Sequence, residues 1–172
     1  MKFKKILLSA KKQGEAEVKK AYTEAVRLLT EKGLTVSVAE SCTGGLIGKL
    51  FTDVSGASAI FAGGMITYTN SVKINKLGVA AETIEKYTEV SAECAAEMAE
   101  RAKAYFETDI GISATGFAGP TGGNENDPVG TVYLGISAQN ETTVYRLSFN
   151  DCTRDEIRTG VARLAAELII CA

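Results

Sequence analysis

Apolar residues recur along the chain with helical spacing in some segments and as dense β-rich runs in others. Val18, Tyr22, Ala25 and Leu29 fall on one face of a helix, and Gly33 is placed to end it. The segments that follow alternate between β-rich runs and helical patterns. This alternation predicts an α/β fold in which helices cover a buried sheet.

The predicted elements follow one another with short links. We expect strands over residues 34–39, 59–68, 109–114, 131–138 and 142–149, and helices over 44–51, 70–77 and 92–106. A last helix opens at Thr153 and Glu156, which are spaced as a capping box. Residues 115–130 form a loop that holds five glycines and both prolines of the chain. A loop this long is more typical of a functional segment than of a simple connection.

The length of 172 residues fits one domain. We assign residues 1–14 to a basic N-terminal leader and residues 15–172 to the domain. The apolar run 6–8 is too short for a signal peptide, and no stretch approaches the roughly 18 apolar residues of a membrane span. The sequence therefore predicts a cytoplasmic protein with no membrane partner.

Composition narrows the chemistry that the chain can perform. Nineteen basic and 21 acidic side chains give a net charge of −2 and a pI near 5.4, which argues against a nucleic-acid binder. The chain has no histidine, so a Ser-His-Asp triad, a Cys-His dyad and a His-ligated metal site are excluded. Its four cysteines are widely spaced and form no C-x-x-C pair, so we expect free thiols and no structural zinc site.

The first candidate site is the turn formed by Ser41, Cys42, Thr43, Gly44 and Gly45, between a predicted strand and a predicted helix. Amides at a helix N-terminus favour anions, so Ser41 could act as a nucleophile with these amides as its oxyanion hole. On local pattern alone, a capped helix after a tight turn is an equal alternative. Cys42 is an alternative nucleophile, but a buried and unreactive thiol is the favoured interpretation because no histidine can activate it.

The second candidate site lies at the end of the next strand. Tyr68 closes that strand, and Lys73 falls in the first turn of the following helix, where the helix dipole should lower its pKa. Without histidine, a neutral lysine is the most credible general base for a serine. A solvated surface lysine is the alternative, and it is favoured when Lys73 is judged alone.

The third candidate site combines the glycine-rich loop with two arginines. The loop leaves strand 109–114 at the same sheet edge as Ser41 if the strands run parallel. Arg154 and Arg158 are spaced i, i+4 in the first two turns of the last helix, where cations oppose the dipole. A bound phosphate or carboxylate would explain them, and surface decoration is about as consistent with the spacing alone.

Four stretches of the chain together resemble a known family. They are VAESCTGGLIGKL, GGMITYTNSVKINKLGV, ISATGFAGPTGGNENDPVGTVYLGI and FNDCTRDEIRTGVARL. In this order and spacing, and over nearly all of residues 15–170, the chain resembles the C-terminal domain of the competence/damage-inducible protein CinA, whose free-standing form is a nicotinamide mononucleotide (NMN) deamidase. The resemblance implies a single-domain, three-layer α/β/α sandwich with a central mixed sheet. It also implies hydrolysis of the NMN carboxamide to nicotinate mononucleotide and ammonia.

The resemblance also implies roles for individual residues. It makes Ser41 the nucleophile, with Tyr68 and Lys73 as its helpers. The family often has Gly-Asp-Arg where this chain has the sequence Asp-Cys-Thr-Arg over 151–154, so Arg154 and Arg158 both remain candidates for the arginine of the pocket. The expected substrate-binding residues are Cys42, Thr43, Gly44, Gly45, Asn70, Thr115, Gly116, Arg154 and Arg158.

The implied ligand is a small-molecule nucleotide, with no metal, no organic cofactor and no nucleic acid, and we expect a homodimer. Two alternatives remain: a non-catalytic nucleotide-binding or regulatory module with the same pocket, and a serine amidase for another amide. The presence of Ser41, Tyr68 and Lys73 together favours an enzyme, because a module that only binds nucleotide does not need this trio.

Overall fold

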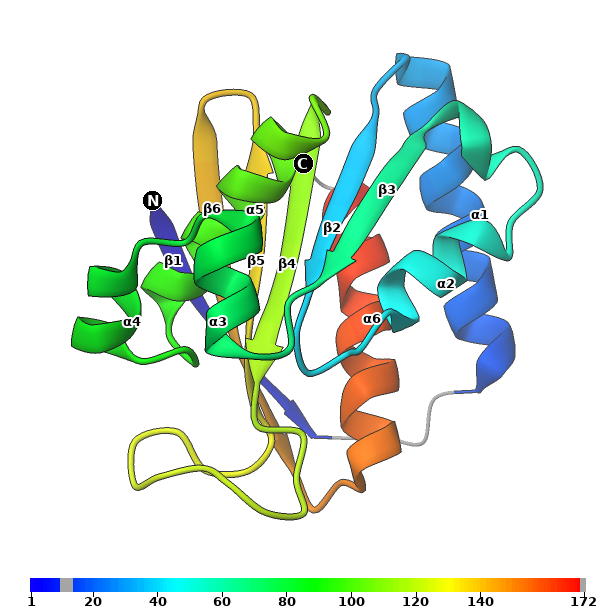
Figure 1. The fold of residues 1–172 in the computed structure, drawn as a ribbon. Coiled ribbons are helices and arrows are strands. Elements are labelled where there is room, and N and C mark those ends of the chain that lie inside the picture. The colour runs from blue at the N-terminus through cyan, green and yellow to red at the C-terminus, as the bar shows by residue number, and fades with distance from the viewer. Residues whose placement is uncertain (10–13, 171–172) are drawn as a thin grey trace.

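The computed structural model describes the backbone of residues 1–9 and 14–170 and the side chains of residues 1–4 and 14–170. Six strands form one sheet in the order β1-β6-β5-β4-β2-β3 (Figure 1). Strand β5 runs antiparallel to both of its neighbours, and the other pairs are parallel, so the sheet is mixed as predicted. The strands are β1 (Lys2–Ser9), β2 (Val36–Glu40), β3 (Phe61–Ile66), β4 (Ile110–Gly116), β5 (Thr131–Ala138) and β6 (Glu141–Asn150).

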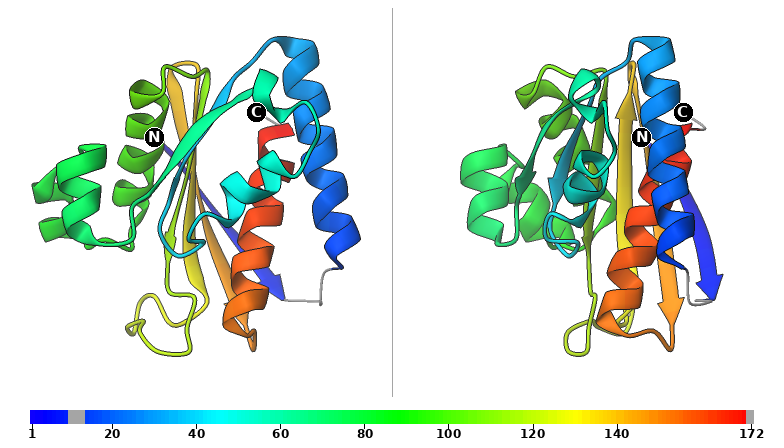
Figure 2. Two further views of the ribbon diagram at one scale, coloured as in Figure 1. Left: turned by 45° about the vertical axis from the view of Figure 1, so that its right-hand side comes forward. Right: turned by 90° about the vertical axis from the view of Figure 1, so that its right-hand side faces the viewer.

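Helices cover both faces of the sheet, which confirms the three-layer α/β/α architecture (Figure 2). One layer holds α1 (Glu15–Lys32), α2 (Leu46–Thr52) and α6 (Arg154–Ile170). The other holds α3 (Asn70–Val72), α4 (Ala81–Tyr87) and α5 (Ala92–Tyr105). The described residues also form the 3₁₀ turn η1 (Ala57–Ala59) and the π-helical turn η2 (Lys73–Leu77).

The first helix shows how the predicted apolar face becomes core. Val18, Tyr22, Ala25 and Leu29 are all buried, and α1 ends at Gly33 in the left-handed conformation, with φ 65°. The Tyr22 hydroxyl donates a 2.9 Å hydrogen bond to the carbonyl of Ala162, which joins α1 to α6. This bond gives the buried phenol a partner, which a buried hydroxyl needs to offset its lost hydration.

The N-terminal segment differs from the sequence prediction. Residues 1–14 were expected to form a leader, but Lys2–Ser9 form β1, which pairs in parallel with β6 at the edge of the sheet. Residues 10–13 of that segment lie outside the described residues. Lys2 and Lys4 are exposed on this strand, and charged side chains on an edge strand discourage pairing with another chain. The lysines that suggested a solvated leader are thus also typical of an edge strand.

Helix α4 was not predicted, and its capping explains why. None of its residues is buried, so it carries no apolar stripe. Its first turn is held by Glu97 of α5, whose carboxylate accepts hydrogen bonds from the amide of Ala80 (2.8 Å) and the hydroxyl of Thr83 (2.7 Å). A cap supplied from a distant helix leaves no local sequence signal.

The parallel strands bring the three candidate sites to one edge of the sheet. The carboxyl ends of β2, β4 and β6 meet there, next to the glycine-rich loop and the start of α6 (Figure 1). The amide of Ser41 donates a 2.9 Å hydrogen bond to the carbonyl of Ala114, so the turn after β2 is fixed to the end of β4. Ligand sites in open α/β sheets form at such an edge.

Within the described residues, the helices are too short or too polar to span a lipid bilayer.

Candidate active site

A buried lysine and a serine form the centre of the candidate site. The Lys73 Nζ donates a 3.2 Å hydrogen bond to the Ser41 Oγ and a 2.9 Å bond to the carbonyl of Thr67. Lys73 is only 1% exposed and Ser41 is 8% exposed. Because Lys73 is buried against a serine, its interpretation as a solvated surface lysine is wrong.

The turn after β3 aims the Lys73 side chain at the sheet edge. Thr69 caps this turn, and its hydroxyl accepts a 3.4 Å hydrogen bond from the amide of Val72. Lys73 is the first residue of the π-helical turn η2, which ends at Gly78 with φ 85°. The sequence predicted one short helix closed by Gly78, and the π turn is the part it did not predict. Such turns occur frequently at functional sites.

Burial sets the protonation of Lys73. The loss of solvent lowers the pKa of its ammonium, and the negative charges that Cys94, Glu89 and Cys42 can carry oppose part of that shift. Desolvation is the largest cause of the lowering, because burial disfavours the charged form of an amine. Lys73 is therefore neutral at a lower pH than an exposed lysine, as a general base requires.

Cys42 is not poised to compete with Ser41. Its side chain is buried, and burial raises the pKa of the thiol to about 12. The thiolate is the nucleophilic form of cysteine, so a thiol with this pKa is almost entirely unreactive near neutral pH. The geometry favours the expected interpretation of Cys42 as a packed neighbour of Ser41.

Glu40 is a site residue that the sequence analysis did not identify. Its buried carboxylate, 1% exposed, accepts hydrogen bonds from the amides of Gly45 (2.9 Å), Ile47 (3.1 Å) and Gly48 (2.8 Å). A carboxylate at the N-terminus of a helix satisfies free amides and complements the dipole. The available signal was an acidic residue at the end of a buried strand, five positions before the glycine that precedes α2.

Glu40 also restricts which amides can stabilise an oxyanion. The amide of Gly45 is bound to Glu40, and the amide of Gly44 donates to the carbonyl of Ser41 at 3.1 Å. Of the expected donors over residues 42–45, the amides of Cys42 and Thr43 are the two that no carbonyl or carboxylate occupies within the described part of the chain. These two follow the serine directly in the chain.

Replacement of Glu40 by alanine is expected to destabilise the protein by about 3 kcal/mol, because one buried and two partly buried amides lose their acceptor. Glu40→Gln keeps one carbonyl acceptor and should cost less. Chemical denaturation of both variants would measure the effect. Glu31→Ala, which removes an exposed carboxylate paired with Arg27, is the control and should change stability by less than about 1 kcal/mol. Equal losses for Glu40→Ala and Glu31→Ala would contradict this role.

The two predicted arginines have different partners. Arg158 donates from Nη2 (2.8 Å) and Nε (3.3 Å) to the carbonyl of Thr43, so it holds the turn that carries Ser41. Arg154 donates to the carbonyl of Gly119 (2.7 Å) in the glycine-rich loop and to the hydroxyl of Tyr68 (3.3 Å). Both side chains extend from the first two turns of α6 toward the site, so they are not merely surface side chains spaced i, i+4 on a helix.

Tyr68 lies at the open side of the site. It is 59% exposed, and within the described residues its hydroxyl is hydrogen-bonded to Arg154 rather than to Ser41 or Lys73. The structure therefore brings Tyr68 to the site but does not place it in direct contact with the serine and lysine pair.

The other predicted binding residues lie near the site in supporting positions. Thr115 is buried at the end of β4 and donates a 2.7 Å hydrogen bond to the carbonyl of Glu89. Gly116 follows it, and a Cβ there would lie 2.5 Å from the carbonyl of Thr131, so strand packing alone requires glycine. Asn70 is exposed in α3. None of these three bonds to Ser41 or Lys73 in the described part of the chain.

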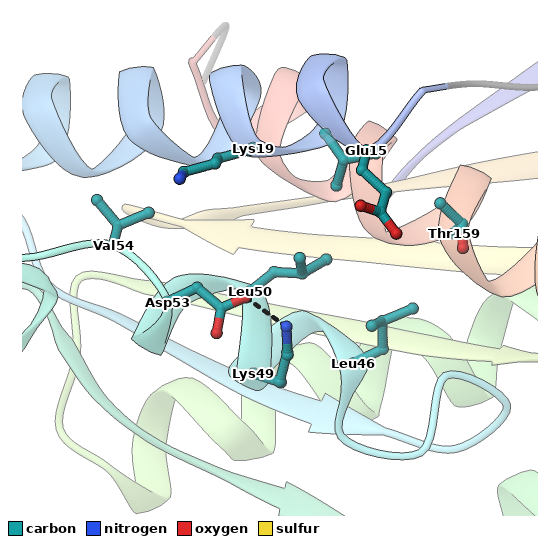
Figure 3. Close-up of a pocket in the computed structure, with 9 residues that line it drawn as sticks. Glu15, Lys19, Leu46, Lys49, Leu50, Asp53, Val54 and Thr159 are labelled. Atoms are coloured by element: carbon teal, nitrogen blue, oxygen red, sulfur yellow. Dashed lines mark hydrogen bonds and ion pairs between the residues drawn. The ribbon is translucent and has the colours of Figure 1, made fainter.

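A separate hollow of about 490 Å³ lies between α1, α2 and α6 (Figure 3). Glu15, Lys19, Leu46 and Thr159 line it, and an exposed ion pair joins Lys49 to Asp53 there at 2.5 Å. None of the sequence-predicted site residues lines this hollow. The buried serine and lysine pair, not the size of a hollow, locates the candidate site.

Among the side chains that the structure describes, those of residues 1–4 and 14–170, no group of three or more Asp, Glu, Cys or His residues is arranged to hold a metal ion.

Comparison with known proteins assigns the chain to a family. The profile of the CinA C-terminal domain matches residues 18–171. The chain belongs to the CinA C-terminal domain family. Among solved structures, the competence/damage inducible protein CihA of Agrobacterium tumefaciens is similar, with a TM-score of 0.88, 36% identity, and coverage of 94% of this chain and 98% of that one. The competence damage-inducible protein A (ComA) of Klebsiella pneumoniae gives a TM-score of 0.85 at 30% identity, covering 88% and 94%.

Longer relatives match this chain over part of their length. A CinA-like protein of Leptospira borgpetersenii is 46% identical over 148 residues, which cover 86% of this chain and 35% of the relative. A CinA-like protein of Kosmotoga olearia is 45% identical over 144 residues, covering 84% and 35%. The chain thus spans about a third of the length of these relatives.

Proposed function

We propose that this CinA-family domain hydrolyses the carboxamide of NMN through a serine nucleophile. The observation that carries the proposal is the hydrogen bond between the buried Lys73 amine and the Ser41 hydroxyl. A nucleophile within hydrogen-bond reach of a base is the signature of covalent catalysis. The choice of NMN as the substrate rests on the resemblance of the motifs to those of NMN deamidases.

In the first half of the reaction, neutral Lys73 takes the proton of the Ser41 hydroxyl as the Oγ attacks the carboxamide carbon. The charge that develops on the carboxamide oxygen is stabilised by the amides of Cys42 and Thr43, the donors that Glu40 and the turn leave open. The Lys73 ammonium then returns the proton to the leaving nitrogen. The C–N bond breaks, ammonia departs, and an ester joins Ser41 to the nicotinoyl group.

In the second half, water attacks this ester while Lys73 accepts a proton from it. The tetrahedral intermediate collapses, the proton passes back to the Ser41 oxygen, and nicotinate mononucleotide leaves. The carbonyl of Thr67, 2.9 Å from the Lys73 Nζ, keeps the amine oriented toward Ser41 throughout. One lysine thus serves as base and acid in both halves.

The two arginines have different roles in this proposal. Arg158 is bound to the carbonyl of Thr43 and positions the catalytic turn. Arg154 is the more exposed of the two, and its guanidinium lies between the loop and Tyr68. Arginine binds phosphate through charge-assisted hydrogen bonds, so we assign the phosphate to Arg154 and a wall of the substrate pocket to the exposed Tyr68 ring.

Ammonia release from purified protein tests this function. NMN, nicotinamide, nicotinamide riboside and NAD would be compared as substrates. Release that is selective for NMN is expected. Binding of NMN without any release would instead indicate a nucleotide-binding module, and release from other amides in preference to NMN would indicate a different serine amidase.

A further inference from the structure

A cluster away from the serine and lysine pair ties the glycine-rich loop to the sheet. Arg146 of β6 donates to the Asp127 carboxylate from Nε (3.1 Å) and Nη2 (3.0 Å), and to the carbonyl of Asn126 from Nη2 (2.8 Å). Tyr133 of β5 donates its hydroxyl to the same carboxylate oxygen at 2.9 Å. Arg146 is itself held by the hydroxyl of Ser148 at 3.0 Å.

Both partners of this ion pair are shielded from solvent, unlike those of the Lys49–Asp53 pair. The side chains of Arg146 and Asp127 are 15% and 16% exposed, whereas those of Lys49 and Asp53 are 64% and 43% exposed. Exposed pairs contribute little because water and salt screen them. A shielded arginine that makes several hydrogen bonds to one loop fixes the position of that loop more firmly than an exposed ion pair would.

The loop needs such an anchor because its backbone is permissive. Gly119, Gly122, Gly123 and Gly130 adopt positive φ angles of 71°, 96°, 83° and 95°. Glycine reaches many other conformations at similar energy, so a loop with several of them does not hold one shape by itself. Asp127 is presented to Arg146 by a local turn.

The other end of the loop reaches the candidate site. The carbonyl of Gly119 accepts the 2.7 Å hydrogen bond from Arg154, and Arg154 also binds the hydroxyl of Tyr68. A loop that shifts would withdraw this carbonyl and release Arg154. The loop is thus bound to β6 through Arg146 and Asp127, and it binds Arg154 of the candidate site through the carbonyl of Gly119.

We propose that Arg146, through Asp127, is a positioning residue that fixes the glycine-rich loop and thereby sets Arg154 for a phosphate-bearing pyridine nucleotide. The kinetic part of this inference rests on the proposed function, because it takes the phosphate to be bound by Arg154. The structural part, anchoring of the loop, stands on the contacts alone. Neither residue touches the reacting atoms.

The test combines amide hydrogen exchange with calorimetric binding. Arg146→Met and Asp127→Asn remove the ion pair, Arg146→Lys keeps the charge, and Arg27→Met removes an exposed arginine that pairs with carboxylates on α1. Exchange over residues 117–130 is expected to be faster in the first two variants, partly restored in Arg146→Lys and unchanged in Arg27→Met. Exchange in α5 should stay constant, which shows that the fold is intact.

Binding then separates the positioning role from a merely structural one. The Kd for NMN should rise about tenfold in Arg146→Met and Asp127→Asn, because small displacements of a positioning group weaken its contacts strongly. The Kd for nicotinamide riboside, which lacks the phosphate, should change little, and kcat for NMN should stay near that of wild type.

Two results would overturn the inference. Unchanged exchange over residues 117–130 in Arg146→Met and Asp127→Asn would show that this ion pair does not anchor the loop, whatever the activity of the variants. Faster exchange together with equal increases in the Kd for NMN and for nicotinamide riboside would show that the loop does not act through Arg154 on the phosphate. If wild type neither binds nor hydrolyses NMN, the proposed function fails, and the exchange data alone decide the anchoring role.

Discussion

Replacing Ser41 by alanine is expected to lower kcat for NMN by about 10⁴-fold or more, the loss typical of removing a catalytic nucleophile. The substitution removes one hydroxyl from a side chain that is 8% exposed. Lys73 keeps its hydrogen bond to the carbonyl of Thr67, so the fold should not change. Steady-state ammonia release, with the melting temperature as a check on folding, would measure the effect.

Two control variants make the Ser41 result specific. Ser71→Ala removes an exposed hydroxyl that accepts a 3.1 Å hydrogen bond from Asn75, and it should leave kcat unchanged. Cys42→Ala removes the neighbouring thiol, and it should retain most of the activity because burial keeps the pKa of that thiol near 12. If Ser41→Ala stays active while Cys42→Ala is inactive, the nucleophile is Cys42 and not Ser41.

Replacing Lys73 by methionine is expected to lower kcat by about 10³-fold, within the range that general acid–base catalysis supplies. Methionine is an unbranched apolar chain that fits a buried position, and it cannot accept the serine proton. The matched control is Lys76→Met, an exposed lysine three residues further along η2. A Lys73→Met enzyme with the kcat of wild type would rule out the lysine as base.

The pH profile of wild type tests the same residue without mutation. Burial lowers the pKa of Lys73, so the neutral amine predominates above that lowered pKa and the ammonium below it. Because only the neutral amine can act as base, kcat/KM should fall as the pH falls through this pKa. The fall should lie at lower pH than the titration of an exposed lysine. A profile that is flat from about pH 5 to 10 would contradict a lysine base.

The sequence predicts the layers of this fold well because their signals are local. The apolar face from Val18 to Leu29, the αL glycine at Gly33 and the capping box at Thr153 each act within a few residues, and the structure confirms all three. Strand β1 depends instead on pairing between Lys2 and Thr143, which no local pattern contains.

The sequence predicts several of the residues that the structure brings to the candidate site, but not the contacts between them. The motifs single out Ser41 and Lys73, but their side chains meet across 32 positions through the π turn of η2. Glu40 was missed because an acidic residue at a strand end has no definite role until the amides of α2 are placed around it. The interpretation of Lys73 as solvated failed because burial depends on tertiary packing.

A covalent intermediate on Ser41 is the central claim, and mass spectrometry can observe it directly. Wild type would be mixed with NMN, quenched in acid within one turnover, digested with trypsin and examined at the peptide of residues 33–49, which contains Ser41 and Cys42. A nicotinoyl nucleotide ester on Ser41, formed as ammonia appears, is the predicted result. An adduct on Cys42, or ammonia released in the first turnover with this peptide unmodified, would contradict the account.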